Sequence, residues 1–319
     1  MLLFIVTAAV VFVAATNGAN ANFKGVASLY GSGTTTLRTA LWWGTATTFL
    51  GGLAVTVVTS RLVQQFSGRG LVADAVAAPP LFVAAVGLAA ACTSLVATRL
   101  GFPVSTTHAR VGALVGAGVA GAGTVNWTTL GTSVVVPLVV SPLLAVILAA
   151  VLYALLRALD LAPAHRTGIL DVAHFTSTGA ASFARGLNDT PKIAALLSVM
   201  PGADPAAAIV TVAVARAVGG LAGGPRVAET LGKRVTDMDP GQGFAASLAT
   251  AGLVSTASVH GLPVSTTHVS VGALVGLGST TLQAHWRSIG EIVVAWVTTV
   301  PCGAVLAAVA WWVLSVAMR

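Results

Sequence analysis

Charged residues are scarce in this sequence. Asp, Glu, Lys and Arg together make up 8% of its 319 residues, whereas a soluble globular protein carries charge on about a quarter of its residues. So few charges cannot cover a water-facing surface of this size, which excludes a soluble fold. Hydrophobic residues make up 56% of the chain, and this excludes disorder too, because disordered segments are polar.

Cysteine is nearly absent, and the basic residues form no tract. The two cysteines, Cys92 and Cys302, both lie in apolar runs, which excludes a disulfide framework and a cysteine-based metal site. The net charge is +7, but the 16 Lys and Arg residues are dispersed, so nucleic acid is not an expected partner. No nucleophile–base pair or metal cluster stands out, so we expect neither an enzyme nor a metal site beyond one for Na⁺.

Long segments without any charged residue determine the class of protein. A helix that crosses the ~30 Å hydrocarbon core of a bilayer needs about 20 apolar residues. The chain is therefore predicted to be an all-α polytopic membrane protein with roughly 10–12 helical segments. We expect it in the lipid bilayer of the cell membrane, and its compact loops are typical of a prokaryotic protein. The uncharged segments are residues 1–23, 39–60, 75–98, 111–156, 240–286 and 292–318.

The sequence repeats itself. Residues 101–118 read GFPVSTTHARVGALVGAG and residues 261–278 read GLPVSTTHVSVGALVGLG, a match of 14 of 18 positions at an offset of 160. A weaker match at an offset of 168 joins GANANFK at residues 18–24 to GLNDTPK at residues 186–192. Both motifs occur in the same order in each half, which chance similarity does not explain.

These matches predict two transmembrane repeats, residues 1–157 and 171–319, joined by a connecting loop at 158–170. In each repeat we expect a broken first span, further spans and a second break at the Pro-Val-Ser-Thr-Thr-His motif. Internal repeats are typical of secondary transporters, which hold substrate near the midplane with broken helices. Whether the repeats are inverted depends on the number of spans in each half.

The Pro-Val-Ser-Thr-Thr-His motif has the chemistry of an anion site. Proline cannot continue a helix, whereas the Ser and Thr that follow are good N-cap residues, so a helix should begin there. A helix N-terminus presents unpaired N–H groups that favour an anion, and the hydroxyls add donors. Two facing copies would form a cage for a tetrahedral oxyanion; the alternative is two capped turns at the membrane surface. The hydroxyl residues are Ser105, Thr106, Thr107, Ser265, Thr266 and Thr267.

The second motif places charge within apolar sequence. Asn188-Asp189-Thr190-Pro191 also has the pattern of a helix start, and Asp189 and Lys192 have the spacing of one helix face. Ionisable groups inside a membrane are candidates for function because they are costly to bury. Together with the Asn188 amide, Asp189 could bind Na⁺; it could also carry a proton or accept a hydrogen bond from a protonated oxyanion. The alternative is an ion pair with Lys192 or Arg185 that only stabilises the bundle.

The first-half counterpart lacks the acid, since Ala21 matches Asp189 while Asn20 and Lys24 match Asn188 and Lys192. The two lysines therefore balance Asp189 with a net charge of +1, which favours a divalent anion. Four arginines near expected span ends are predicted to extend their charges to the membrane surface. Two histidines are predicted to bond neighbouring carbonyls, with a proton relay as the alternative. These are Arg38, Arg99, Arg110, Arg216, His108 and His268.

On these motifs, the chain resembles the inorganic phosphate transporter (PiT) family over nearly its whole length, as a divergent member with Ala21 in place of the first Asp and Lys24 in place of a second Asn. The resemblance implies symport of inorganic phosphate with Na⁺ or H⁺ and no cofactor. It also implies an inverted-repeat fold with re-entrant hairpins, and a homodimer with elevator-like movement. The implied anion site comprises Asn20, Asn188, Asp189 and the six hydroxyl residues, and the implied cation sites involve Asn188 and Asp189.

Two other functions remain open on the same scaffold. A sulfate permease would carry a similar tetrahedral anion, but sulfate has no proton to donate to Asp189, whereas hydrogen phosphate has one. An uncoupled anion channel would let the anion follow its own electrochemical gradient.

Overall fold

The computed structural model of the chain describes residues 2–58, 71–72, 79–198, 200, 202–260, 262 and 264–317. Within them the fold is helical, with an isolated antiparallel bridge between Thr236 and Ala284. Six of the described helices are long and apolar enough to cross a membrane. The predicted all-α, multi-pass membrane architecture is therefore confirmed. Pro263 of the second Pro-Val-Ser-Thr-Thr-His motif lies outside the described residues.

The described helices fall into two series, one in each half of the chain. The first series comprises α1 (Leu2–Ala21), the 3₁₀ turn η1 (Asn22–Gly25), α2 (Ala27–Gly31), α3 (Leu37–Val58), α6 (Pro80–Arg99), α7 (Thr106–Ala122), α8 (Trp127–Leu130), the π-helical turn η2 (Gly131–Val135) and α9 (Val136–Ala158). The second comprises α10 (Gly168–Ser198), α11 (Pro205–Lys233), α12 (Pro240–Val259), α13 (Thr266–Thr281) and α14 (Trp286–Ala317).

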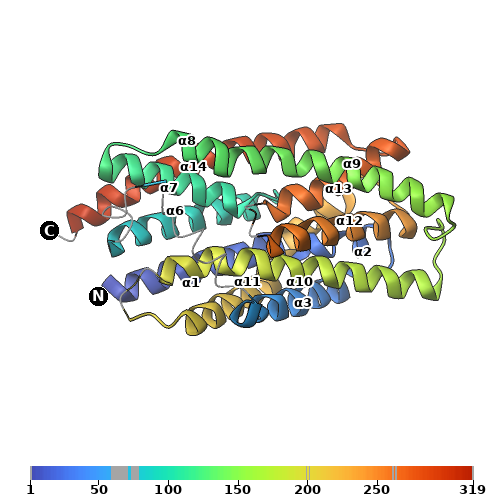
Figure 1. Cartoon of the computed structure of the whole chain (residues 1–319), viewed down its shortest axis with the longest axis horizontal. Coiled ribbons are helices and arrows are strands. Elements are labelled where there is room, and N and C mark those ends of the chain that lie inside the picture. The colour runs from blue at the N-terminus through green and yellow to red at the C-terminus, as the bar shows by residue number, and fades with distance from the viewer. Residues whose placement is uncertain are drawn as a thin grey trace.

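The helix boundaries follow the sequence repeat. α3 and α11 begin 168 residues apart, at Leu37 and Pro205, and α6 and α12 begin 160 residues apart, at Pro80 and Pro240. The two series run in opposite directions: α1 enters from the end where both termini lie, and α10 enters from the other end (Figure 1). The repeats are therefore inverted.

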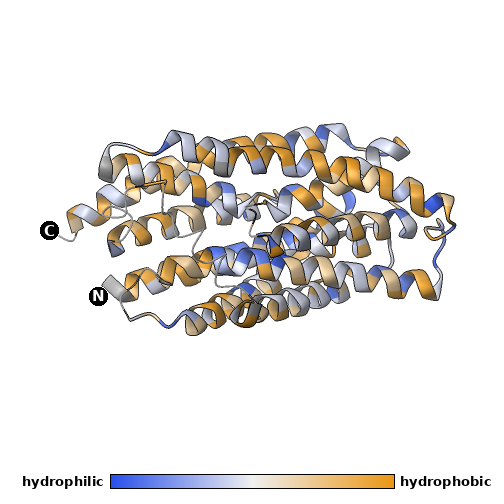
Figure 2. Ribbon diagram, viewed as in Figure 1, coloured by the Kyte–Doolittle hydropathy of each residue, from blue (hydrophilic) through white to orange (hydrophobic). Residues whose placement is uncertain are grey.

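Each half contributes one helical hairpin that turns back in the middle of the molecule. The α6–α7 hairpin comes from one end, the α12–α13 hairpin comes from the other, and their tips meet (Figure 1). At the meeting point the Ser265 hydroxyl donates a hydrogen bond to the Ser105 hydroxyl at 2.9 Å. Hydrophilic residues gather in this central region, between largely hydrophobic helices (Figure 2).

The first span is broken in one half only. In the first half α1 ends at Ala21 and the chain passes through η1 before α2 begins. In the second half α10 is continuous and contains Pro191 in its interior, so the predicted helix start at Asn188 is wrong. A proline removes one backbone hydrogen bond of the helix, and in a membrane helix neighbouring groups can satisfy the freed carbonyl. The cap-like sequence is not sufficient to begin a helix there.

Glycines on the hairpin helices allow close packing against the outer helices. A Cβ at Gly116 of α7 would collide with the Ala304 carbonyl oxygen of α14, and a Cβ at Gly276 of α13 would collide with the Val146 carbonyl oxygen of α9. Such contacts tie each hairpin to the long helix of the other half, α7 to α14 and α13 to α9.

We predict that Gly116→Ala lowers the free energy of unfolding by about 1–3 kcal/mol, because the added methyl group must push α7 away from α14. The measurement is denaturation of the purified protein in detergent. Gly290→Ala in α14 is the matched control, since a Cβ there meets no atom within 4 Å. Equal stability of the two variants would contradict the proposed packing constraint.

Candidate functional site

The hairpin tips place two helix N-termini face to face. Ser105 caps α7 by accepting a hydrogen bond from the His108 amide at 3.3 Å, and Ser265 caps α13 through the His268 amide at 3.2 Å. The predicted helix starts at the Ser-Thr-Thr motifs are therefore confirmed. The amides of a first helical turn have no partner within the helix, so both N-termini present an environment that favours an anion.

Lys24 is held in a shell of oxygen atoms next to the first tip. Its Nζ donates hydrogen bonds to Asn20 Oδ1 at 2.8 Å, to the Val104 carbonyl at 2.7 Å and to Thr267 Oγ1 at 2.7 Å. The Asn20 amide nitrogen in turn donates to Thr98 Oγ1 at 2.9 Å. Lys24 therefore connects α1 to both hairpin tips.

Lys192 repeats this arrangement in the second half. Its Nζ donates to Asn188 Oδ1, and to the Val264 carbonyl at 2.9 Å. The Asn188 amide nitrogen donates to Ser258 Oγ at 3.1 Å. Each of these contacts matches one in the first half at the repeat offsets, so the two lysine sites are related by the internal symmetry.

Asp189 lies among cations. Its Oδ2 accepts a hydrogen bond from Thr266 at 3.1 Å and lies 3.6 Å from Nη2 of Arg216, while its Oδ1 lies 3.6 Å from Nζ of Lys192. The predicted shared face of Asp189 and Lys192 is confirmed. The carboxylate is thus an acceptor shared by several donors rather than half of a single ion pair.

Three buried arginines complete the cluster. Arg185 donates to Thr266 Oγ1 and Ser270 Oγ, at 3.0 Å each, and Arg216 donates to Asn17 Oδ1 at 2.7 Å. The third is Arg110 on α7, and only 4% of this residue is exposed.

The prediction that Arg110 and Arg216 extend to the membrane surface is wrong, since only 4% and 1% of these residues is exposed. Arg38 and Arg99 are exposed as expected. The repeat offsets carried a signal for two of the three buried arginines: Asn17 stands where the second half has Arg185, and Arg110 stands where it has Ser270. Polar residues thus occupy both members of each pair.

The cluster has a large excess of positive charge. Five buried cations interact electrostatically with Asp189, which is the only buried acid in the described part of the chain. Unpaired charge is costly in a membrane interior, so the uncompensated positive charge of the cluster favours an anion there. The five cations are Lys24, Arg110, Arg185, Lys192 and Arg216.

All the predicted site residues are buried around this point. The hydrogen bonds above join most of them into one network, whereas Thr107 is buried without a side-chain hydrogen bond to the others. Thr106 belongs to the network because its Oγ1 accepts a hydrogen bond from the amide nitrogen of Asn17 at 2.7 Å, and Asn17 in turn accepts one from Arg216. The set comprises Asn20, Lys24, Ser105, Thr106, Thr107, Asn188, Asp189, Lys192, Ser265, Thr266 and Thr267.

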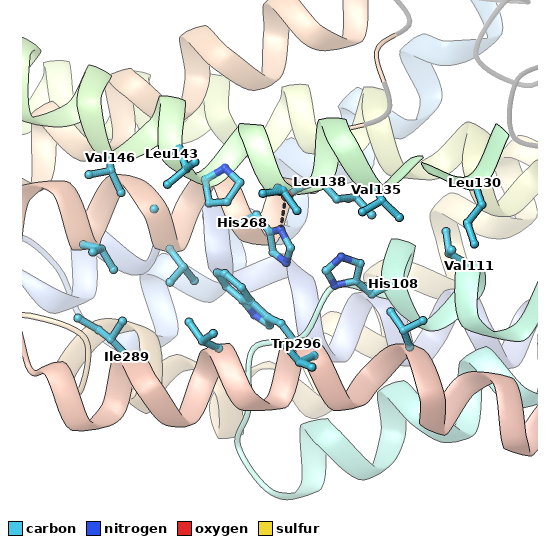
Figure 3. Close-up of a pocket in the computed structure, with 18 residues that line it drawn as sticks. His108, Val111, Leu130, Val135, Leu138, Leu143, Val146, His268, Ile289 and Trp296 are labelled. Atoms are coloured by element: carbon cyan, nitrogen blue, oxygen red, sulfur yellow. Dashed lines mark hydrogen bonds between the residues drawn. The ribbon is translucent and has the colours of Figure 1, made fainter. Parts of the chain in front are cut away.

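A separate cavity of about 590 Å³ lies behind the tips, lined by side chains of α7, α9, α13 and α14 (Figure 3). His108 and His268 reach into it with ring centroids 4.5 Å apart, and the other lining residues are almost all apolar. The predicted histidine–carbonyl contact is present at His268, whose Nδ1 is 2.9 Å from the Leu138 carbonyl oxygen, but His108 Nδ1 has no hydrogen-bond partner. With so few polar groups, this cavity does not suit an anion.

Comparisons with known proteins agree with this arrangement. A model of the phosphate transporter family matches residues 17–169 and 162–307. A "Probable low-affinity inorganic phosphate transporter" of Rhizobium meliloti (strain 1021) is 30% identical over 266 residues, 78% of this chain and 78% of that protein. A protein of the same description from Mycobacterium leprae (strain TN) is 28% identical over 94% of this chain and 75% of its own length.

The fold also matches a solved structure, described as "The sodium-dependent phosphate transporter". The TM-score is 0.86 with 24% sequence identity, and the match covers 99% of each chain. At this identity the similarity establishes the fold.

We predict that Asp189→Asn lowers the free energy of unfolding by about 3–5 kcal/mol, because it leaves the five cations without a buried acid. Glu291→Gln is the matched control: Glu291 forms an exposed pair with Arg287 at 3.4 Å, and such pairs contribute about 0–1 kcal/mol. Denaturation in detergent without phosphate or sulfate measures both. A loss at Asp189 no larger than that at Glu291 would show that the carboxylate does not balance the cluster.

Proposed function

The chain belongs to the phosphate transporter family, and from this premise we propose that it is a symporter of inorganic phosphate across the cell membrane. The observation that carries the proposal is the excess of buried positive charge where the two hairpin tips meet. A phosphate ion placed there would balance part of that charge, and it would be reachable from either side by movement of one tip.

The donors at the tips suit a tetrahedral oxyanion. The N-termini of α7 and α13 supply first-turn amides, and Ser105, Thr106, Thr107, Ser265, Thr266 and Thr267 supply hydroxyls, all from buried positions. Charge-assisted hydrogen bonds to an oxyanion are roughly twice as strong as neutral ones. Asn20 and Asn188 also help to position these tips. Their side-chain oxygens hold Lys24 and Lys192, and these lysines in turn donate hydrogen bonds to the tip carbonyls.

Asp189 is the residue that would distinguish phosphate from sulfate. Its carboxylate can accept a hydrogen bond from the protonated oxygen of hydrogen phosphate, whereas sulfate has no proton to donate to it. The comparisons give no support to sulfate as the substrate. We assign Asp189 to substrate selection, and together with Asn188 to the coupling cation, H⁺ or Na⁺.

A symporter can be distinguished from an uncoupled channel by its ability to concentrate the substrate. We expect purified protein in liposomes to accumulate radiolabelled phosphate above equilibrium when a cation gradient is imposed, with little inhibition by unlabelled sulfate. Asp189→Asn should reduce phosphate uptake much more than any residual sulfate uptake.

Parallel experiments with a proton gradient, a Na⁺ gradient and neither would identify the coupling ion. Glu291→Gln serves as the control for an acid outside the cluster. Uptake that only equilibrates phosphate would indicate a channel, and uptake of labelled sulfate in place of phosphate would contradict the assignment of Asp189.

We further propose that the protein is a homodimer that associates through the apolar surface of α9 and α14. These helices are the least buried of the six candidate spans: 28% of the residues in the most apolar part of α9, and 22% of those in α14, are buried inside the protein. Val305 on α14 is 63% exposed. A second copy would cover this surface, while the hairpins could move within each protomer.

Light scattering in mild detergent should therefore give twice the 31.7 kDa chain mass. Val305→Trp should shift the protein towards monomers by disturbing the α14 surface. Val57→Trp is the matched control, since Val57 is 88% exposed on α3, away from the proposed interface. Monomeric wild-type protein, or equal effects of the two variants, would contradict this interface.

A further inference from the structure

The two buried lysines have surroundings that resemble those of a bound metal cation. Lys24 has three N–H donors, and each finds an oxygen at 2.7–2.8 Å: an amide oxygen, a backbone carbonyl and a hydroxyl. Proteins coordinate Na⁺ with the same groups, in particular with carbonyls where helices are unwound. Lys24 itself lies in such a segment, the 3₁₀ turn η1 between α1 and α2.

The second lysine occupies the symmetry-related position with a similar set of oxygens. Lys192 has the Asn188 amide oxygen, the Val264 carbonyl and, at 3.6 Å, a carboxylate oxygen of Asp189. The two ammonium groups are therefore a symmetric pair of cations at the two tips. Both are covalently attached to the protein and only 2–3% exposed.

These oxygen sets do not fit an additional Na⁺. At Lys24 the three oxygens that would coordinate the ion are already hydrogen-bonded to the ammonium, and Asn20 Oδ1 also accepts from the Val104 amide at 3.0 Å. An added cation would also enter a cluster in which five cations face one carboxylate. Repulsion between like charges in a poorly solvated site disfavours that addition.

We propose that the ammonium groups of Lys24 and Lys192 are built-in cations that take the place of mobile Na⁺ at both tips, so that the protein binds and transports phosphate without Na⁺. The oxygens that a mobile ion would organise are organised permanently by the lysines. Gradients other than that of Na⁺ must then drive accumulation. The uptake part of this inference depends on the proposed phosphate transport, whereas the binding part does not.

Direct binding of radioactive Na⁺ to the purified protein tests the inference without transport. The wild-type protein should bind no Na⁺ above the background of a filter without protein, with choline chloride used to keep ionic strength constant. Specific Na⁺ binding by the wild-type protein would overturn the proposal, whatever the substrate proves to be. Absence of phosphate uptake under every gradient would instead count against the proposed function.

Substitution of the lysines should create a requirement for Na⁺. Lys24→Asn leaves its three oxygens without an ammonium and removes one charge, which Na⁺ can restore. We expect Na⁺ binding to appear in Lys24→Asn, and Na⁺ to stimulate its phosphate uptake on the order of tenfold, equivalent to about 1.4 kcal/mol. Lys192→Asn should behave alike, as its symmetry partner, so that one variant remains if the other does not fold.

Lys233→Asn provides the matched control. Lys233 also donates to a backbone carbonyl, that of Gly31 at 3.2 Å. It is exposed at the end of α11, however, and is not one of the five buried cations at the tips. It should remain independent of Na⁺ in binding and uptake. Wild-type uptake that requires Na⁺, or folded lysine variants that still neither bind nor respond to it, would overturn the proposal.

Discussion

The balance of buried charge is the constraint on which the structure depends. Five cations and one carboxylate meet in the middle of an apolar helical protein, where water cannot screen them. Fixed oxygens hold four of these cations, for example Lys24 through Asn20 and two tip oxygens, and Arg185 through Thr266 and Ser270. Such solvation by the protein lowers the cost of burial but leaves the net charge in place. The remaining charge is the basis of our proposal that the site binds a multivalent oxyanion.

The inverted repeat makes this site possible without making its two halves equal. Symmetry supplies two tips, two N-termini and two lysines, so an anion would meet similar donors from both sides of the membrane. The sequence then departs from symmetry at charged positions: Arg185 replaces Asn17, Arg110 replaces Ser270, and Asp189 has Ala21 as its counterpart. As a result, the cluster has its carboxylate, Asp189, in the second half. In the proposed function, selection of a protonated anion would therefore belong to the second half, whereas binding of negative charge would belong to both.

How much the sequence could predict depended on whether a feature was local. The helix starts at Ser105 and Ser265 follow from capping chemistry within a few residues, and the two matched motifs indicated that the tips form one site. Arg110 and Arg216 could not be placed in this way, because their burial depends on partners from distant segments, such as Asn17 199 residues from Arg216. Pro191 shows the opposite limit: its local pattern predicts a helix start, but packing of α10 against its neighbours keeps the helix continuous.

The distribution of contacts also indicates how the tips can separate. Each half holds its own tip through charged side chains: Lys24 bonds the Val104 carbonyl, Lys192 bonds the Val264 carbonyl, and Arg185 bonds Thr266. Between the tips, the neutral hydrogen bonds of the described residues are the Ser265–Ser105 bond and a bond from Thr267 to the Val104 carbonyl. Neutral hydrogen bonds contribute only about 0.5–1.5 kcal/mol each, so separating the tips breaks weak contacts. The exception is the bond from Lys24 to Thr267, which makes this lysine a charged link to the second tip. A substrate oxyanion that drew the Thr267 hydroxyl towards itself would weaken that link, so that anion binding and release of the tips would be coupled through one ammonium group.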